Sequence, residues 1–211
     1  MIFRRPLLAF LPTLLPVLAL AQALPQTAAP PASEPEIDPR LAERFAGRAG
    51  APVTVLEHFS LTCGHCAAFH RDTWPRVKRD LVDTGRMRMV FRDFPLDGVA
   101  LAAAAVARSL PAERYEAFIS TLFASQDRWA FGRGVNSAEE LAKIAALAGM
   151  SRAQFDAAVA DQALARGILE QRVRAQQEFN VASTPTFVFG TRVVPGAIDF
   201  TRFAALVAET R

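Results

Sequence analysis

The distribution of apolar residues predicts a strand, a helix and a second strand early in the chain. Residues 53–60 form an apolar run rich in β-branched side chains, which is typical of a buried strand. Residues 67–82 carry apolar side chains at helical spacing, and we expect this helix to kink near Pro75 and to stop at Gly85. Residues 86–92 alternate between polar and apolar side chains and predict the next strand. A strand, a helix and a strand in this order predict a right-handed parallel unit.

The pattern over residues 97–179 is almost entirely helical. Asp97 is placed to cap an Ala-rich helix, and Ser137-x-x-Glu140 and Ser151-x-x-Gln154 have the spacing of capping boxes at the starts of two later helices. A long last helix is predicted over 161–179. Seven apolar residues at helical spacing are expected to pack in the core of this segment: Phe118, Leu122, Phe123, Leu141, Ile144, Leu147 and Phe155.

Strand patterns return toward the C-terminus. Residues 187–189 and 192–194 predict an antiparallel hairpin, and a final helix is expected to begin after Asp199. Thr184-Pro185 comes directly before the hairpin. A proline at the start of a strand must lie at an edge or a bend, because it has no N–H group to donate. The sequence does not decide whether this peptide bond is cis.

Residues 1–23 have the form of a secretory signal peptide. Two arginines precede an apolar stretch that two prolines interrupt, and Ala21-Gln22-Ala23 matches a cleavage site. An uncleaved membrane anchor is the alternative, but the stretch is shorter than a membrane span requires. Residues 24–40, rich in Pro and Ala, predict a linker. Residues 41–211 then form one domain with a helical insertion at about 97–179, and we expect no membrane span after cleavage.

The charge of the chain argues against nucleic acid as a partner. The net charge is +3, and without the two signal-peptide arginines the 24 basic residues fall to 22, against 21 acidic ones. The remaining basic residues are dispersed along the chain. Dispersed charges predict a solvated surface more than a phosphate-binding patch.

Both cysteines of the chain lie in one tetrapeptide, Cys63-Gly64-His65-Cys66. Thr62 can serve as the N-cap of the following helix, which places Cys63 at a helix N-terminus, where free N–H groups and the helix dipole favour a thiolate. His65 can add a donor or a positive charge. Cys66 lies one turn into the helix and suits the resolving role. In an exported protein, one such closely spaced pair indicates a redox-active disulfide, Cys63–Cys66, more than a structural one.

A metal site is the alternative from a different functional class. Cys63 and Cys66, with His65 or His70, could bind Cu(I), because soft thiolates suit that ion, as in a copper carrier. Structural zinc usually draws four ligands from two such pairs, and haem attachment needs His directly after the second Cys, where this chain has Ala67. We therefore predict no metal and no cofactor.

Glu57 is unusual in the first predicted strand. Strand alternation places it on the same face as the apolar residues Val55 and Phe59. If buried there, it is positioned to accept or donate the proton of Cys66. The alternative is a solvated carboxylate at a wet strand end. His70 is expected to be a surface or packing residue.

Together these motifs resemble the DsbA family of bacterial disulfide oxidoreductases. The resemblance runs from about residue 51 to the C-terminus and rests on the dithiol, on Arg92-Asp93-Phe94-Pro95-Leu96 and on Thr184-Pro185-Thr186-Phe187. It implies an α/β, thioredoxin-like fold: a central mixed sheet flanked by helices, with an all-helical insertion.

The resemblance also implies roles for particular residues. Cys63 is then the attacking cysteine and Cys66 resolves the mixed disulfide. Pro185 is then cis, with Thr184 facing the dithiol and pairing with a substrate peptide. Glu57 corresponds to the buried acid of the family.

The function implied by the resemblance is a periplasmic oxidoreductase that introduces disulfide bonds into unfolded or reduced exported proteins. A DsbB-like membrane oxidant, linked to quinone, would restore its disulfide, and no cofactor is required. Two departures from the family pattern bear on the direction of electron transfer, that is, on whether the protein oxidises or reduces its substrates. Gly64-His65 stands where strongly oxidising members have Pro-His, and Thr184 stands where many oxidases have Val. Gly-His also occurs in isomerases of this fold. An isomerase or reductase is therefore the alternative within the same chemistry.

Overall fold

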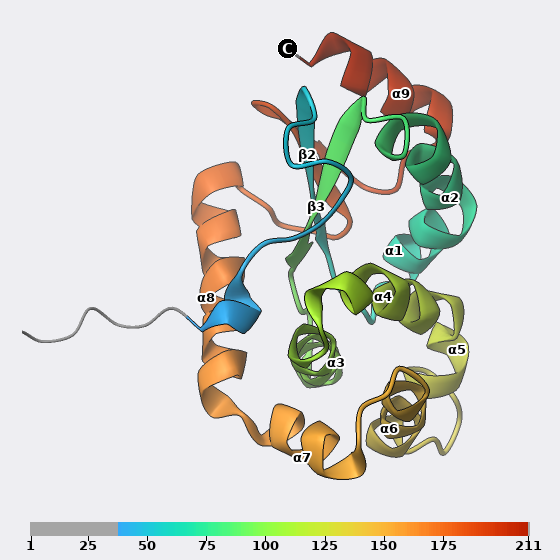
Figure 1. Ribbon diagram of the computed structural model, residues 1–211, viewed down its shortest axis with the longest axis vertical. Coiled ribbons are helices and arrows are strands. Elements are labelled where there is room, and N and C mark those ends of the chain that lie inside the picture. The colour runs from blue at the N-terminus through green and yellow to red at the C-terminus, as the bar shows by residue number, and fades with distance from the viewer. Residues whose placement is uncertain (1–37, 211) are drawn as a thin grey trace, which may run out of the picture. The chain divides into compact units, whose positions relative to one another are not determined.

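A five-stranded mixed sheet forms the centre of the computed structural model, which describes residues 38–210 (Figure 1). The strands lie in the order β1-β3-β2-β4-β5. Strands β2 and β3 pair in parallel, and the other pairs are antiparallel. The strands are β1 (Arg44–Ala46), β2 (Val53–Phe59), β3 (Met87–Asp93), β4 (Thr186–Phe189) and β5 (Arg192–Pro195). The predicted parallel pair and the C-terminal hairpin are confirmed.

Helices cover both faces of the sheet and form the insertion between β3 and β4. Figure 1 shows α1, α2 and α9 on one side of the sheet, α8 on the other, and α3 to α7 beyond its end. The helical elements are η1 (Pro39–Leu41), α1 (Gly64–Ala68), η2 (Phe69–Thr73), α2 (Trp74–Val77), η3 (Lys78–Val82), α3 (Gly98–Ser109), η4 (Ala112–Arg114), α4 (Tyr115–Ala124), α5 (Gln126–Trp129), α6 (Ser137–Leu147), α7 (Arg152–Ala160), α8 (Gln162–Phe179) and α9 (Phe200–Glu209). The mixed α/β fold with a helical insertion is confirmed.

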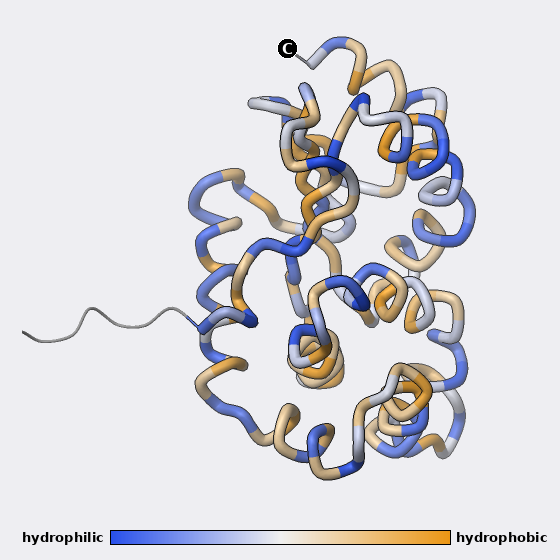
Figure 2. Tube along the Cα trace, in the orientation of Figure 1, coloured by the Kyte–Doolittle hydropathy of each residue, from blue (hydrophilic) through white to orange (hydrophobic). Residues whose placement is uncertain are grey.

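The core lies between the central strands and the helices packed on them. Val55 on β2 and Met89 on β3 are fully buried, and Figure 2 shows the apolar stretches turned inward while the outer helix faces are hydrophilic. Phe69, Phe187 and Phe203 join the helix after the cysteines, the sheet and α9 through ring contacts of 4.6 to 5.9 Å between centroids. This aromatic packing holds the cysteine-bearing helix against the sheet.

The helix after β2 is irregular where Pro75 was expected to kink it. Two π-helical turns, η2 and η3, stand on either side of the short helix α2 that contains Pro75. Proline has no N–H group, so one backbone hydrogen bond of the helix is lost. The wider π-helical turns accommodate this lost bond without ending the helix. The segment stops before Gly85, which has a positive φ of 77°.

Three of the helix caps predicted for residues 97–210 are confirmed, and one is wrong. Asp97 and Asp199 accept backbone N–H groups at the starts of α3 and α9, and Ser151 with Gln154 forms the expected capping box. Asp161, which was not predicted as a cap, accepts N–H groups at the start of α8. The capping box at Ser137 is wrong. Asn136 caps α6 instead, by accepting the N–H groups of residues 138 and 139, and Glu140 pairs with Lys143.

The core prediction for the insertion also fails at one position. Leu147, expected to be buried, is 88% exposed at the end of α6, whereas Phe118, Leu122 and Leu141 are buried. Periodicity shows which face of a helix is apolar, but not how far along the helix that face is covered by other elements. Leu147 is exposed because the end of α6 extends past the elements on which the helix packs.

The beginning of the described chain is attached to the insertion. Arg40 contacts Asp38 at 2.6 Å and Asp161, the cap of α8, at 2.7 Å. The predicted signal peptide and residues 24–37 of the predicted linker lie outside residues 38–210. Within those residues, no helix has the length and apolar character required to cross a membrane.

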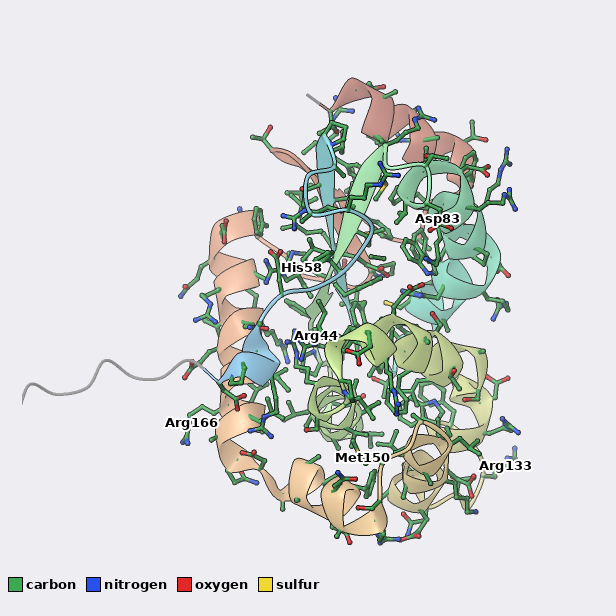
Figure 3. The ribbon with its side chains drawn as sticks, viewed as in Figure 1. Arg44, His58, Asp83, Arg133, Met150 and Arg166 are labelled. Carbon is green, nitrogen blue, oxygen red and sulfur yellow. The ribbon has the colours of Figure 1, made fainter. Side chains whose placement is uncertain are left out.

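His58 lies on the face of β2 opposite Glu57, in the layer between the sheet and α8 (Figure 3). It is 3% exposed, and neither ring nitrogen has a hydrogen-bond partner in the described part of the chain. Burial, together with the positive charge of Arg92, lowers the pKa of His58 to about 4. The folded protein therefore holds this imidazole neutral.

The low pKa of His58 predicts acid sensitivity. The unfolded chain takes up a proton at this position below about pH 6.5, whereas the folded chain does so only near pH 4, so stability falls as the pH drops between these values. We expect a loss of about 3 kcal/mol at most from this group. Urea unfolding of the parent protein and of His58→Gln across this range should show a shallower pH dependence in the variant. Parallel profiles would contradict the prediction, and His65→Gln, at an exposed position, is the control.

Candidate active site

Cys63 ends the turn that leads from β2 into α1 and is itself the cap of that helix. Its N–H donates to the carbonyl of Ser60 at 3.0 Å, and its Sγ accepts the N–H of Cys66 at 3.4 Å. The prediction that Thr62 caps this helix is wrong. The Thr62 hydroxyl instead donates to Asp97 at 2.7 Å, at the start of α3. The reactive sulfur therefore occupies the position where a helix N-terminus favours negative charge.

The two cysteines are free thiols with different surroundings. Cys63 is 8% exposed, whereas Cys66 is completely buried. A hydrogen bond from the Cys66 thiol lowers the pKa of Cys63 to about 5. Burial opposes this effect, and the backbone N–H groups of Cys66 and His65 add to it. Burial, followed by the hydrogen bond to Cys63 and its charge, raises the pKa of Cys66 far above its usual range.

This difference decides which sulfur is a thiolate. Neutral pH is about two units above the pKa of Cys63, so this thiol is almost fully ionised. Cys66 keeps its proton. Only Cys63 therefore combines partial access to solvent with the charge that thiol exchange requires.

The loop before β4 lies against the cysteine pair. The peptide bond between Thr184 and Pro185 is cis, and the carbonyl oxygen of Thr184 lies 3.2 Å from Cys63 Sγ. Both residues are buried, while the preceding Ala182 and Ser183 are exposed. The structure thus brings together two segments that are 121 residues apart in the chain.

Glu57 is buried and paired with a histidine. It is 0% exposed, and its two carboxylate oxygens lie 3.0 and 3.2 Å from Nε2 of His70. The alternative that Glu57 is solvated at the strand end is therefore wrong. His70 is 5% exposed and stacks on Phe123 at 4.3 Å between ring centroids. The Glu57 carboxylate contributes to the raised pKa of Cys66.

The histidines around the cysteines do not support metal binding. His65 is exposed and contributes its backbone N–H to Cys63, while the Nε2 atom of His70 is engaged by Glu57. Across residues 38–210 no cluster of three or more His, Cys, Asp or Glu side chains is arranged to hold a metal ion. The copper-carrier alternative therefore lacks a third ligand among these side chains.

Two polar contacts of the site were missed by the sequence analysis. His70 was considered only as a surface, packing or metal-binding residue, although its spacing of four from Cys66 placed it on the same helix face. Gln126 was not considered at all. Its side-chain amide, from the insertion, donates to the carbonyl oxygens of Leu61 and Cys63. A four-residue helix gives no sequence signal that would place this side chain at the cysteines.

The chain resembles known proteins over most of its length. The profile of the thioredoxin family matches residues 40–209. A Rickettsia typhi protein, named as a protein-disulfide oxidoreductase, is 27% identical over 155 residues, which are 72% of this chain and 57% of that protein. A Rickettsia felis protein with the same description is 29% identical over 143 residues, 67% of this chain and 49% of that one. The chain spans about half the length of these relatives.

Solved structures show the same arrangement of elements. The crystal structure of alpha-DsbA1 from Wolbachia pipientis has a TM-score of 0.74 and 27% identity, and the match covers 80% of this chain and 90% of that one. BdbD from Bacillus subtilis has a TM-score of 0.70 at 18% identity, over 82% of this chain and 94% of that one. The second likeness is one of fold alone.

Proposed function

Because this chain belongs to the thioredoxin family and, within it, to the DsbA-like thiol-disulfide oxidoreductases, we propose that it introduces disulfide bonds into exported proteins through a reversible Cys63–Cys66 disulfide. The observation that carries the proposal is the difference between the two thiols. Cys63 has a pKa of about 5, and Cys66 is buried and protonated. A thiolate that is stabilised in this way favours the reduced form of the protein, so the oxidised form gives its disulfide away readily.

The reaction is a pair of thiol exchanges. A substrate thiolate attacks Sγ of Cys63, the Cys63–Cys66 bond breaks, and Cys66 leaves with the electron pair and takes up a proton. The second substrate thiolate then attacks the substrate sulfur that is bound to Cys63, and Cys63 leaves as a thiolate. The substrate loses two electrons and gains a disulfide, and the protein gains the two electrons as a dithiol. Cys63 is the attacked and released sulfur. Cys66 is the leaving group of the first step, and it resolves the mixed disulfide when the reaction runs in reverse.

Glu57 and His70 are assigned to the proton that Cys66 needs. Cys66 is completely buried, so solvent cannot supply this proton directly. The Glu57 carboxylate acts on Cys66 through its charge, and its hydrogen bond to His70 joins it to a second group that can carry a proton. His65 supports the Cys63 thiolate through its backbone N–H.

Thr184 and Pro185 are assigned to substrate binding. The Thr184 carbonyl lies beside the sulfur that forms the mixed disulfide, and the exposed residues before it leave that side of the loop open. A substrate segment bound in extended form would pair with this backbone as an added strand, which gives affinity without requiring a particular side chain. Such recognition suits a protein that acts on many unfolded clients.

The signal-like sequence of residues 1–23 supports a periplasmic location, and a single exchangeable disulfide supports reoxidation by a DsbB-like membrane oxidant. An isomerase or reductase is the second candidate, favoured by the Gly64-His65 pair between the cysteines. The two candidates differ in the potential of the same dithiol.

The reduction potential of the dithiol tests the proposal. Equilibration of the protein lacking residues 1–23 in glutathione buffers should give a value near about −120 mV, as for a strong oxidase. A value near about −180 mV would identify an isomerase-like protein, and one near about −270 mV a reductase. A dithiol that does not oxidise reversibly would refute the redox function.

A further inference from the structure

The side chain of Gln126 connects the helical insertion to the backbone of the cysteine turn. Gln126 is the first residue of α5 and is 4% exposed. Its Nε2 donates to the carbonyl oxygen of Leu61 at 2.7 Å and to that of Cys63 at 3.2 Å. An amide NH₂ group has two hydrogens, and both are used here.

The two carbonyl oxygens belong to the turn that sets the position of the Cys63 sulfur. Cys63 also accepts the N–H of Ala67 at 3.0 Å, the first backbone bond of α1. Gln126 therefore provides the second donor to the carbonyl from which the helix begins. Leu61 is 1% exposed, and a buried carbonyl that lost its donor would be costly to leave unpaired.

The orientation of this carbonyl and the position of the sulfur are linked by the backbone of Cys63. With φ of −89° and ψ of 117°, Cys63 places its Sγ within 3.4 Å of the N–H of Cys66 and 3.2 Å from the carbonyl of Thr184. A rotation about ψ turns the carbonyl and moves the helix N–H groups relative to the sulfur. A donor that holds the carbonyl therefore also holds the sulfur against the helix N-terminus.

We propose that Gln126 is a positioning residue through which the helical insertion sets the reduction potential of the Cys63–Cys66 dithiol. The inference rests on the proposed redox function. Within residues 38–210, Thr62 also donates to Asp97 at the start of the insertion, and the N–H of Leu96, just before the insertion, donates to the hydroxyl of Ser60. Those contacts hold the residues before Cys63, whereas Gln126 holds Cys63 itself.

Two substitutions at Gln126 test the inference. Gln126→Met keeps a similar volume but removes both donors. Gln126→Glu keeps the shape and places a carboxylate against two carbonyl oxygens. The pKa of the Cys63 thiol should rise by about half a unit to one unit in the methionine variant. It should rise further in the glutamate variant.

The reduction potential of the dithiol should become more negative as the pKa of Cys63 rises. Because the reduced form loses stabilisation, the equilibrium with glutathione should shift about three- to tenfold toward the disulfide, where tenfold corresponds to about −30 mV. Both quantities are measured on the folded protein, by the ultraviolet absorbance of the thiolate against pH and by equilibration in glutathione buffers. A change that only loosened the fold would alter the stability and leave both quantities unchanged.

Gln154→Met is the matched control. Gln154 forms the capping box of α7, so its replacement removes a glutamine hydrogen bond from the same insertion and should lower stability without moving the potential. If both Gln126 variants keep the parent pKa and potential, or if Gln154→Met shifts them equally, the inference is wrong while the redox function stands. Failure of the parent dithiol to oxidise reversibly would instead refute the proposed function.

Discussion

Cys63→Ser is expected to abolish the oxidation of a reduced substrate protein. A serine hydroxyl cannot form a disulfide with Cys66, and the remaining Cys66 is fully buried, with a raised pKa that leaves it protonated at neutral pH. The rate at which substrate thiols disappear should therefore fall to that of the reaction without protein. The measurement is the count of free thiols in a reduced, unfolded substrate over time.

The matched variant Cys66→Ala separates the two roles. It keeps the Cys63 thiolate, which can attack a disulfide-containing substrate, but it removes the thiol that resolves the product. A mixed disulfide between protein and substrate should accumulate and be visible as a band of higher mass that a reducing agent removes. Normal turnover by Cys63→Ser, or an accumulated mixed disulfide through Cys66 in that variant, would overturn the assignment of Cys63 as the exchanging sulfur.

Arg108→Met is expected to destabilise the fold by about 3–5 kcal/mol. Arg108, on α3, is 1% exposed and pairs with Asp93 at the end of β3, and the hydroxyl of Tyr115 on α4 donates to the same carboxylate at 3.0 Å. Arg108 also donates to the carbonyls of Arg40 and Ala42. Methionine fills much of the volume but leaves the Asp93 carboxylate buried without its cation. Urea unfolding at neutral pH measures the loss.

A surface pair provides the comparison for this prediction. Arg192 and Glu209 also form a close ion pair, but their side chains are 53% and 52% exposed. Arg192→Met should therefore change the free energy of unfolding by no more than about 1 kcal/mol, because solvent and salt screen the pair. Equal losses in the two variants would show that burial of the Asp93 pair does not set its contribution.

Local signals predicted the elements of this fold well. Strands β2 and β3, the hairpin and the aspartate caps of α3 and α9 depend on neighbouring residues, so sequence periodicity and cap chemistry were sufficient. The wrong caps had a local cause too. At α6, Asn136 competes with Ser137 from one position earlier, and at α1 the Cys63 sulfur competes with the hydroxyl of Thr62.

Contacts made across the fold could not be predicted in the same way. The two cysteines were recognised by their spacing, but the pairing of Glu57 with His70 depends on how a helix lies on a strand, and the bonds of Gln126 cross more than 60 residues of chain. Leu147 illustrates the converse, because a residue with the right periodicity has no neighbour to cover it. Periodicity indicates which face of an element is apolar, but not what that face meets.

Because a sulfur caps α1, the redox state of the cysteine pair is linked to the conformational stability of the protein. In the dithiol form the Cys63 thiolate closes the end of the helix, and its low pKa means that this form gains stability as the pH rises from about 5 toward the value of 9 for an unperturbed thiol. A disulfide has no such charge to offer the helix. Oxidation of the pair would therefore remove the negative charge that caps α1, and reduction would restore it.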